Sequence, residues 1–356
     1  MTAELTVLGI ETSCDETAAA VVRGHPPGPG LILSNIVASQ VAAHRPYGGV
    51  VPEIAARAHV EILDAIVERA LAEARLEIAD VDAIAVTAGP GLIGGVAVGL
   101  SLAKGLALAS AKPLIALNHL EGHALTARLT DGVPFPFLLL LVSGGHCQLL
   151  IAEGVGRFVR LGTTIDDAAG EAFDKTAKLL GLGFPGGPAV EAAAARGNPR
   201  RYRFPRPLAG TDGFDFSFSG LKTAVRRAAE TADDLTPATV ADLAAGFQTA
   251  AVDVLVGRTT KAMQFYRERV AGPHRLVVAG GVAANKALNI SLAAAAREAG
   301  FTTAVPSAQL CTDNAAMIAW AGLERLASGE IGDLNAPPRA RWPLDTSRED
   351  IAGAKS

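Results

Sequence analysis

A strand, polar turn and strand unit occurs twice in this chain of 356 residues, and this repeat constrains the fold most. In the first copy, the apolar run Leu5–Glu11 passes through a polar turn into apolar Ala18–Val22. In the second copy, Phe137–Val142 leads through Ser143-Gly144-Gly145-His146 into Gln148–Ala152. Apolar runs on either side of a short polar turn are typical of β-hairpins. The repeat therefore predicts two related α/β lobes.

Helical and strand patterns follow each hairpin and complete the repeat. Val51–Ala74 and Ala83–Val86 follow the first copy, and Asp166–Leu180 and Arg275–Ala279 follow the second. A chain of this length exceeds one ordinary hydrophobic core, so two lobes of about 150–180 residues each are expected. If the two hairpin turns faced each other, they would form a clamp for the phosphates of a nucleotide, because turn N–H groups bind anions.

The expected boundaries follow from where this pattern breaks. Residues 1–130 carry the first copy and residues 131–330 carry the second. At about 183–220 the periodicity gives way to Gly, Pro, Arg and aromatic residues, which predicts an inserted helical subdomain. Residues 331–356 combine a Pro-Pro pair with mixed charges, which indicates an extended or partly ordered tail.

Composition indicates the cellular compartment and limits how the chain could contact RNA. The three cysteines are odd in number and widely separated, which argues against a disulfide framework and favours the cytoplasm. The N-terminus lacks the basic segment of a secretory signal. The most membrane-like stretch, Leu92–Leu117, contains two lysines and a proline, so we expect a buried helix that runs into a strand. The net charge of -4 gives no general attraction for nucleic acid, so any RNA contact must be local.

A pair of histidines has the spacing of metal ligands. In His119-Leu-Glu-Gly-His123 the two imidazoles would lie on one face of a helix, about 40° apart around its axis. Glu121 would point about 200° from His119, so the motif lacks the glutamate that zinc peptidases place beside the first histidine. Ordinary surface or core histidines are the alternative. Asp313 would complete a metal site, or would cap the helix that runs to about Ala327.

Three other segments each allow two interpretations. Val278–Asn285 joins a strand to a helix through Gly280-Gly281, and Asn285 would hydrogen-bond a base or ribose, or the segment is a structural turn. The acidic run Asp166–Asp174 contains candidate functional carboxylates, although a solvated helix face is the usual explanation. Arginines alternate with aromatic residues in Arg196–Arg206, which suits RNA contact or a solvated loop.

Six motifs taken together are more specific than any one of them. They are Gly9-Ile-Glu-Thr-Ser-Cys-Asp-Glu-Thr17, Tyr47-Gly-Gly-Val-Val-Pro-Glu53, His119-Leu-Glu-Gly-His123, Leu141-Val-Ser-Gly-Gly-His146, Gly280-Gly-Val-Ala-Ala-Asn285 and Cys311-Thr-Asp-Asn314. In this order they closely resemble the TsaD family, whose members were once described as glycoproteases. The matches run from about residue 7 to about residue 325, so the resemblance covers nearly the whole chain.

The resemblance implies a fold and a metal. The fold is α/β, the two-lobed actin-like and sugar-kinase-like ATPase (ASKHA) fold, in agreement with the hairpin repeat. The metal is one iron(II) ion per subunit, with His119, His123 and Asp313 as its ligands, and the same ligand set would also hold zinc. Archaeal and eukaryotic relatives carry a metal-binding tyrosine where Leu141 stands here, so solvent or substrate would complete the coordination.

The same resemblance implies an adenylate or ATP-like nucleotide in the cleft between the lobes. The residues expected to bind it are Leu141, Val142, Ser143, Gly144, Gly145, Asp174, Gly187, Glu191 and Asn285. Glu191 stands where many relatives have aspartate. Asp15 and Glu16 are the catalytic candidates that would orient or deprotonate the attacking amine, although acidic residues in turns often only accept backbone N–H bonds. His146 is a further candidate for phosphate contact.

The implied activity is an acyltransferase reaction of tRNA modification. The N6 amine of adenosine 37, in tRNAs that read codons beginning with adenine, attacks threonylcarbamoyl-adenylate, and AMP leaves. The implied partners are tRNA, TsaB and TsaE, with TsaC or its counterpart supplying the adenylate. Two other classes remain open at this point. A metalloprotease would cleave casein or glycoproteins, and an actin-like ATPase or kinase would turn over ATP without tRNA.

Overall fold

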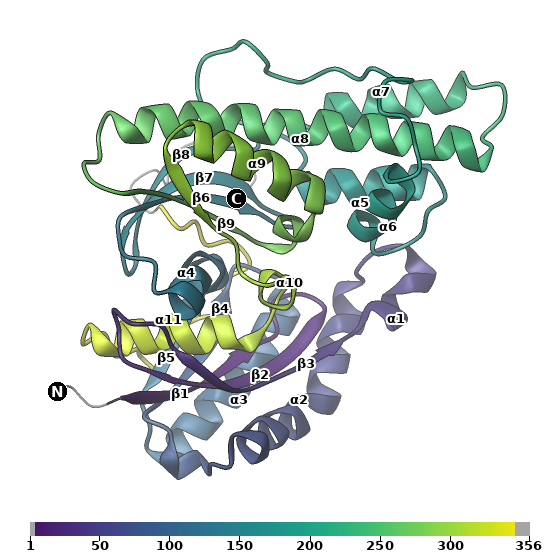
Figure 1. Cartoon of the computed structure of the whole chain (residues 1–356). Coiled ribbons are helices and arrows are strands. Elements are labelled where there is room, and N and C mark those ends of the chain that lie inside the picture. The colour runs from purple at the N-terminus through teal and green to yellow at the C-terminus, as the bar shows by residue number, and fades with distance from the viewer. Residues whose placement is uncertain (1–3, 346–356) are drawn as a thin grey trace.

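Both predicted hairpins are present in the computed structural model, which describes residues 4–345. In the first lobe, β1 (Leu5–Glu11) pairs antiparallel with β2 (Glu16–Gly24). In the second lobe, β6 (Phe137–Val142) pairs antiparallel with β7 (Cys147–Gly154). Each hairpin begins a separate five-stranded sheet. The predicted two-lobed α/β fold is therefore confirmed, and Figure 1 shows one lobe above the other.

Three further strands complete each sheet in the same way. They are β3 (Leu31–Ser39), β4 (Ala83–Gly89) and β5 (Leu114–Asn118) in the first lobe, and β8 (Arg157–Thr163), β9 (His274–Ala279) and β10 (Phe301–Ala304) in the second. The strand orders are β3-β2-β1-β4-β5 and β8-β7-β6-β9-β10. In each order two antiparallel pairings are followed by two parallel ones. The second sheet thus repeats the topology of the first.

The helices of the first lobe follow the predicted segments. They are α1 (Val41–His44), the 3-10 helix η1 (Arg45–Tyr47), α2 (Pro52–Ala74), the 3-10 helix η2 (Ile78–Asp80) and α3 (Ile93–Ser110). Helix α2 begins at a proline, whose missing N–H costs nothing in a first helical turn, and ends where Arg75 adopts a left-handed φ of 56°. Helix α3 runs into β5, as expected for Leu92–Leu117.

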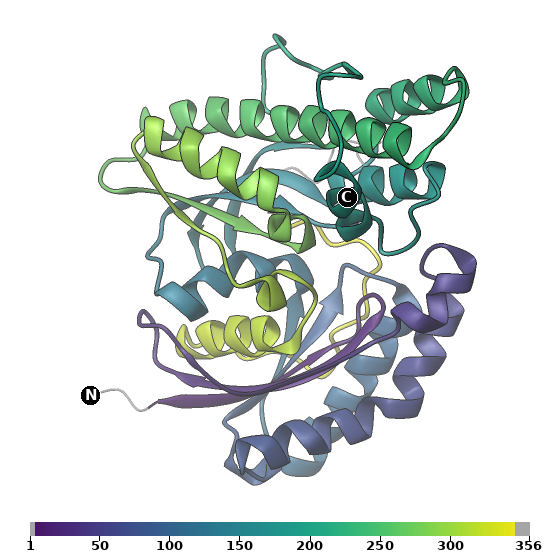
Figure 2. The same cartoon turned by 45° about the vertical axis from the view of Figure 1, so that its right-hand side comes forward.

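The helices of the second lobe all follow β8 in the sequence. They are α5 (Ala169–Leu179), α6 (Gly186–Ala194), α7 (Ser219–Glu230), α8 (Pro237–Arg267), the 3-10 helix η3 (Gly281–Ala284), α9 (Lys286–Glu298) and α10 (Ala308–Cys311). Helix α5 begins three residues later than predicted, because Asp166 instead accepts hydrogen bonds from the N–H groups of Phe218 and Ser219 at the start of α7. Figures 1 and 2 show α5, α6 and α7 together at one end of the lobe, whereas α8 runs across its full width.

The predicted insertion contains less helix than expected. Within residues 183–220, α6 is followed by a long irregular segment that reaches α7. This segment packs along α8: Arg206 forms an ion pair with Asp253, and the N–H of Asn198 donates to Asp242. Within these bounds the helical residues are those of α6 and the first two of α7, whereas the rest of α7 and all of α8 follow the predicted insertion.

Two helices form a layer between the sheets. Helices α4 (His119–Asp131) and α11 (Ala315–Ala327) pack against each other, and a buried ion pair joins Arg128 to Glu324 at 2.7 Å. Helix α11 lies against β1, β2 and β4, although it follows the second lobe in the sequence. The sequence analysis placed this helix with residues 131–330, whereas its packing places it on the first sheet. A helical pattern shows which face is apolar, not which sheet that face will cover.

The chain returns along the first lobe after α11. The N–H of Arg339 donates to the carbonyl of Ala88, and the side chain of Asn118 donates to the carbonyl of Trp342. Asp345 then accepts a bond from the N–H of Arg160 on β8. This part of the predicted tail is extended and joins the two lobes. Its remainder, 346–356, lies outside the described residues.

Two of the described helices, α3 and α8, are long and apolar enough to cross a membrane by length and composition alone. Core helices of globular proteins pass the same test. Helix α3 packs on α2 and β4, and α8 packs on α6, α9 and β6. Both helices are thus accounted for as packing elements of the two lobes.

The contact between β1 and α11 gives a stability prediction. A Cβ added at Gly9 would lie 2.4 Å from the carbonyl oxygen of Ala315 and 2.5 Å from the nitrogen of Ala319. We expect Gly9→Ala to lower the free energy of unfolding by about 1–3 kcal/mol, because close-packed cores accept extra atoms poorly. Urea denaturation measures this. Gly105→Ala, on the exposed face of α3 with no atom near the added methyl, is the control and should stabilise by about 0.5–1 kcal/mol. Equal stability of Gly9→Ala and the parent would contradict this packing.

Candidate active site

A cavity of about 540 Å³ lies between the lobes. Both hairpin turns line it: Ser13, Cys14, Asp15 and Glu16 from the first lobe, and Ser143, Gly144, Gly145 and His146 from the second. The turns are held by neighbouring elements. The carbonyl of Ser13 accepts from the N–H of Leu92, and the carbonyl of Ser143 accepts from the N–H of Gly170 at the start of α5. The two turns therefore face each other across one cavity, which we call the cleft.

The predicted metal ligands converge at one side of the cleft. Ligand atoms of His119, His123 and Asp313 all lie within 4.8 Å of one another. Nε2 of His123 is 3.1 Å and Nε2 of His119 is 3.4 Å from Oδ1 of Asp313. His119 and Asp313 line the cleft, whereas His123 lies behind them and is 1% exposed. Two imidazole nitrogens and one carboxylate oxygen form a donor set that suits iron(II) or zinc.

Asp313 is free for this role because another residue caps the helix. The side chain of Asn314 accepts a hydrogen bond from the N–H of Met317, so Asn314 is the N-cap of α11. Asp313 instead points at the two histidines. The interpretation of Asp313 as the cap is therefore wrong by one position. Asp and Asn are both good N-cap residues, so the sequence alone does not show which of the two neighbours caps the helix.

Glu11 is a site residue that the sequence analysis quoted but gave no role. It is fully buried, and its Oε2 accepts from Nδ1 of His119 at 2.9 Å. Its other bonds come from the hydroxyl of Thr87 and the N–H of Ser13, both at 2.5 Å. The bond from Nδ1 turns Nε2 of His119 toward Asp313. Buried His123 has no such support, since its Nδ1 has no partner among the described residues.

Charges at this site reinforce one another. Burial disfavours ionisation of both His119 and Glu11, but their mutual attraction and hydrogen bonding outweigh it. The pKa of His119 is raised well above its usual value, and Asp313 contributes to that shift. The pKa of Glu11 is lowered. Burial also opposes ionisation of Asp313, yet both histidines hold its pKa far below the usual range. The carboxylates of Glu11 and Asp313 therefore attract positive charge to the imidazoles, and a metal ion bound there would take the place of a proton.

Two other titratable groups in the cleft are shifted toward their neutral forms. Burial raises the pKa of Glu16 to about 9, and the nearby carboxylates of Asp313 and Asp15 add to the shift. Burial lowers the pKa of His146 to about 4, with smaller contributions from His119 and His123. At neutral pH, then, Glu16 carries a proton and His146 carries no charge.

Four predicted nucleotide-binding residues lie on the second-lobe wall of the cleft: Asp174, Gly187, Glu191 and Asn285. Three of them also support the wall itself. Asp174 accepts from the N–H of Gly186 at 2.8 Å, and Glu191 accepts from the N–H of Lys286 at 2.8 Å. Asn285 caps α9 through the N–H of Leu288 and donates to Gln248. Asn285 is thus largely engaged in the fold, and Gln248 is a supporting residue that no sequence motif indicated.

Two predicted binding residues do not reach the cleft. Leu141 and Val142 are fully buried in β6, and their side chains join two different cores on the two faces of the sheet. The central position of β6, between β7 and β9, also engages its backbone in the sheet. Of the predicted segment Leu141–Gly145, therefore, Ser143, Gly144 and Gly145, where the strand has ended, line the cleft, and Leu141 and Val142 do not.

Glu121 points away from the histidine pair, as the helical spacing predicted. It accepts bonds from Arg325 and from the N–H of Gly156, and it is 1% exposed. Burial raises its pKa, opposed by Arg325. A carboxylate occupied in this way is not available as the general base of a peptidase.

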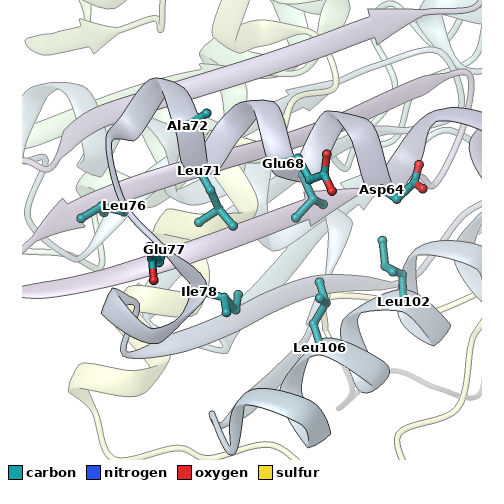
Figure 3. A pocket seen from close by; sticks show the side chains of 10 residues that line it. Asp64, Glu68, Leu71, Ala72, Leu76, Glu77, Ile78, Leu102 and Leu106 are labelled. Atoms are coloured by element: carbon teal, nitrogen blue, oxygen red, sulfur yellow. The ribbon is translucent and has the colours of Figure 1, made fainter.

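A second hollow lies away from the cleft, between α2, η2 and α3 (Figure 3). Apolar side chains, four of them leucines, form most of its lining, which also includes Asp64, Glu68 and Glu77. Its lining contains no histidine, cysteine, serine or basic residue. It therefore offers no set of groups for metal binding or nucleophilic catalysis, and the cleft is the candidate active site.

Sequence comparison places many relatives close to this chain. Residues 31–320 match the TsaD family, described as tRNA N6-adenosine threonylcarbamoyltransferase. The protein of that name from Methylocapsa acidiphila is 61% identical over 350 residues, which cover 98% of this chain and 99% of the relative. Its counterpart in Brucella anthropi is 60% identical over 349 residues, 98% of this chain and 97% of the relative.

Solved structures resemble the fold at low sequence identity. Full-length HypF in a phosphate- and nucleotide-bound form has a TM-score of 0.58 at 13% identity, over 93% of this chain and 47% of that one. Component A of Acidaminococcus fermentans (R)-2-hydroxyglutaryl-CoA dehydratase has a TM-score of 0.51 at 14% identity, over 92% of this chain and 100% of that one. These similarities concern the fold alone, and they confirm the predicted ASKHA fold.

The support that Glu11 gives to His119 leads to a prediction about metal affinity. We expect Glu11→Ala to weaken binding of zinc or anaerobic iron(II) roughly 10- to 100-fold, because partners behind a ligating histidine fix its orientation. Glu11→Gln should lose less, since its amide oxygen still accepts from Nδ1. His119→Ala and Asp313→Ala should abolish stoichiometric binding and leave the protein folded.

Competition with a chromogenic chelator measures these affinities, and circular dichroism checks the fold. Glu121→Gln is the matched control, because Glu121 is equally buried but faces Arg325 rather than the histidines. Equal loss of affinity in Glu11→Ala and Glu121→Gln would show that general destabilisation, not ligand orientation, is responsible. Full metal content in His119→Ala and Asp313→Ala would remove the ligand assignment.

Proposed function

This chain belongs to the TsaD family of tRNA N6-adenosine threonylcarbamoyltransferases, and we propose that it carries out the transfer in the cleft between its lobes. The enzyme is a transferase that modifies adenosine 37 of tRNA with a threonylcarbamoyl group. The proposal concerns where the two substrates bind and which side chains act on them. The observation that carries it is the meeting of both hairpin turns and the His119, His123 and Asp313 cluster in one cavity.

The reaction we propose joins the N6 amine of adenosine to a carbamoyl carbon. The donor is threonylcarbamoyl-adenylate, and the acceptor is a tRNA that reads codons beginning with adenine. A nitrogen–carbon bond forms, the bond between the carbamoyl carbon and a phosphate oxygen breaks, and AMP leaves with that oxygen. The amine loses one proton. Its lone pair is delocalised into the purine ring, so the enzyme must act mainly on the electrophile.

The turn of Ser143, Gly144 and Gly145 is the proposed phosphate site. The N–H groups of Gly144 and Gly145 have no acceptor among the described residues, and no atom lies within 4 Å of a Cβ added at either glycine. With no cationic lysine or arginine in the lining of the cleft, the open N–H groups of this turn are suited to receive an anionic phosphate. Asp174, Gly187, Glu191 and Asn285 would surround the nucleoside on the same wall.

Asp15 and Glu16 would act on the amine. Glu16 keeps its proton at neutral pH, as its pKa of about 9 implies, so it is suited to donate a hydrogen bond. Asp15 is 8% exposed and lines the cleft, and it is the candidate to orient the amine and accept its proton. A single pair of adjacent carboxyl groups would then divide the two roles between them.

His119, His123 and Asp313 would hold the one iron(II) ion per subunit that the family resemblance implies, with zinc as the alternative for this donor set. A bound ion of this kind supplies Lewis-acid polarisation of a carbonyl or phosphoryl oxygen. The protein contributes the orientation of the ligands. Glu11 and Thr87 hold His119 from behind, and Leu141, buried in the core, offers no further ligand atom.

The remaining partners are proposed from the family. TsaB and TsaE would act with this enzyme in the cytoplasm, and TsaC or its counterpart would supply the adenylate. The metalloprotease alternative cannot use the glutamate of its own motif as a base, since Glu121 is bound to Arg325. The ATPase alternative gives no purpose to the convergent histidines and Asp313.

Depletion of the protein in its host tests the function directly. We expect threonylcarbamoyladenosine to disappear from tRNA hydrolysates analysed by mass spectrometry. Re-expression of the parent should restore it, and His119→Ala should not. A modified nucleoside that persists at full level after depletion would exclude this chain as the transferase of that cell.

The phosphate site makes a separate prediction. Gly144→Val should weaken binding of a non-hydrolysable adenylate analogue by roughly tenfold or more, because the side chain would block approach of the phosphate to the turn N–H groups. Isothermal titration calorimetry measures this. Gly28→Val, in the surface loop between β2 and β3, is the control and should bind as the parent does. Unchanged affinity of folded Gly144→Val would contradict the phosphate role of this turn.

A further inference from the structure

The connection between β3 and α2 extends from the first lobe to the mouth of the cleft. Val41, at the start of α1, lines the cleft. From there the chain passes through η1 to Gly48, where an added Cβ would lie 3.5 Å from Nζ of Lys178 on α5. Figures 1 and 2 show α1 of the first lobe opposite α5 and α6 of the second. The two lobes thus approach each other here at the outer edge of the cleft.

Three exposed side chains lie at this edge, and we call them the cleft rim: Arg45, Tyr47 and Lys178. Tyr47 is 59% exposed, and among the described residues it is the one Phe, Tyr or Trp side chain that is exposed rather than buried or half-buried. Lys178 follows Asp174 by four residues on α5, so it continues the cleft wall outward on the same helix face. Neither Arg45 nor Lys178 forms an ion pair within residues 4–345.

The rim segment is anchored from below. His44 is fully buried, its Nε2 donates to Gln40 and its Nδ1 accepts from the N–H of Val51. The 3-10 turn of η1 then ends at Gly48, which has a left-handed φ of 66°. These contacts hold the backbone on both sides of Tyr47. The aromatic ring is exposed on an anchored turn and does not belong to a loose loop.

The acidic lining of the cleft indicates which part of an RNA would contact the cleft rim. The lining contains five carboxylates, Asp15, Glu16, Asp174, Glu191 and Asp313, and no lysine or arginine. The chain as a whole has a net charge of -4. An uncharged nucleobase of the RNA can enter this acidic cleft. The one phosphate site proposed inside it, the turn of Ser143, Gly144 and Gly145, is taken by the adenylate, so the RNA phosphates on either side of the base would stay at the mouth. Cations at the mouth are where those phosphates would find partners.

We propose that the cleft rim binds the anticodon loop of the substrate tRNA. Tyr47 stacks on a base next to the adenosine that enters the cleft, and Arg45 and Lys178, one from each lobe, contact phosphates on its two sides. Single-stranded bases splayed from a loop are commonly held by aromatic stacking with nearby basic side chains. The proposal rests on the cleft as the site of transfer, and it adds a surface that presents the loop to that site.

Tyrosine variants test the stacking. With full-length protein and an unmodified tRNA transcript that reads a codon beginning with adenine, Tyr47→Ala should weaken binding by roughly tenfold or more. Tyr47→Phe keeps the ring and should bind within about twofold of the parent. Ile290→Ala, a similarly exposed apolar position on α9, is the control and should bind as the parent does. Unchanged affinity of Tyr47→Ala would overturn the stacking role.

Salt dependence tests the phosphate contacts. The double variant Arg45→Gln and Lys178→Gln should make the negative slope of log affinity against log salt shallower by about 1.4, since each contact to single-stranded nucleic acid contributes roughly −0.7. Arg297→Gln on α9 is the control and should leave the slope unchanged. An unaltered slope in the double variant would overturn the proposal. If the slope instead becomes shallower when Arg200, Arg201 and Arg203 are replaced by glutamine, RNA binding would be assigned to the Arg196–Arg206 segment along α8.

Binding of the adenylate analogue separates this proposal from the proposed function. Tyr47→Ala and the double variant should bind the analogue as the parent does, because neither position lines the phosphate turn. If they do so and also bind tRNA normally, the rim proposal fails and the cleft proposal stands. If the analogue is insensitive to Gly144→Val, the cleft proposal fails whatever the rim variants show. Loss of a protein partner without loss of tRNA would make the rim a protein-docking surface and overturn the RNA assignment.

Discussion

The buried carboxylate of Glu11 connects more parts of this structure than any other single group. It ends β1, accepts from Thr87 on β4, holds the N–H of Ser13 at the start of the hairpin turn, and orients His119 on α4. A charge without solvent is stable only when its acceptor sites are filled and an opposite charge is close. The sheet, the turn and α4 must therefore take one arrangement. The bonds of Glu11 thus fix the position of the first hairpin turn and the position of His119 together.

The two packed helices α4 and α11 between the lobes bring the residues of the metal cluster together. Helix α4 carries both histidines, and the segment before α11 carries Asp313. The buried pair Arg128–Glu324 joins the two helices, and the close contact of Gly9 with α11 sets the depth of that helix on the first sheet. The ligands come from positions 190 residues apart and meet because these two helices pack together.

Charge is distributed unevenly across the cleft, and this division matches the two substrates of the transfer. Carboxylates and neutral groups line the interior, open backbone N–H groups lie at the second-lobe turn, and free cations are found at the outer edge. A nucleotide phosphate can be bound by N–H groups without a lysine, and an RNA loop can be bound by its backbone outside the cavity. Such an arrangement lets a protein with a net charge of -4 act on a polyanion.

Much of this was determined by the sequence alone. Alternating apolar runs and polar turns gave both hairpins and their repeat, and the i,i+4 spacing of His119 and His123 placed both on one face of a helix, because these patterns depend only on local geometry. Tertiary structure decided the rest. In the folded protein Asn314, not Asp313, caps α11, and Leu141 and Val142 are buried in the core. Helix α11 packs on the first sheet, and Glu11 contacts His119, which is 108 residues away in the sequence. An apolar face or a buried carboxylate does not specify its partner, since the partner is chosen by how distant surfaces pack.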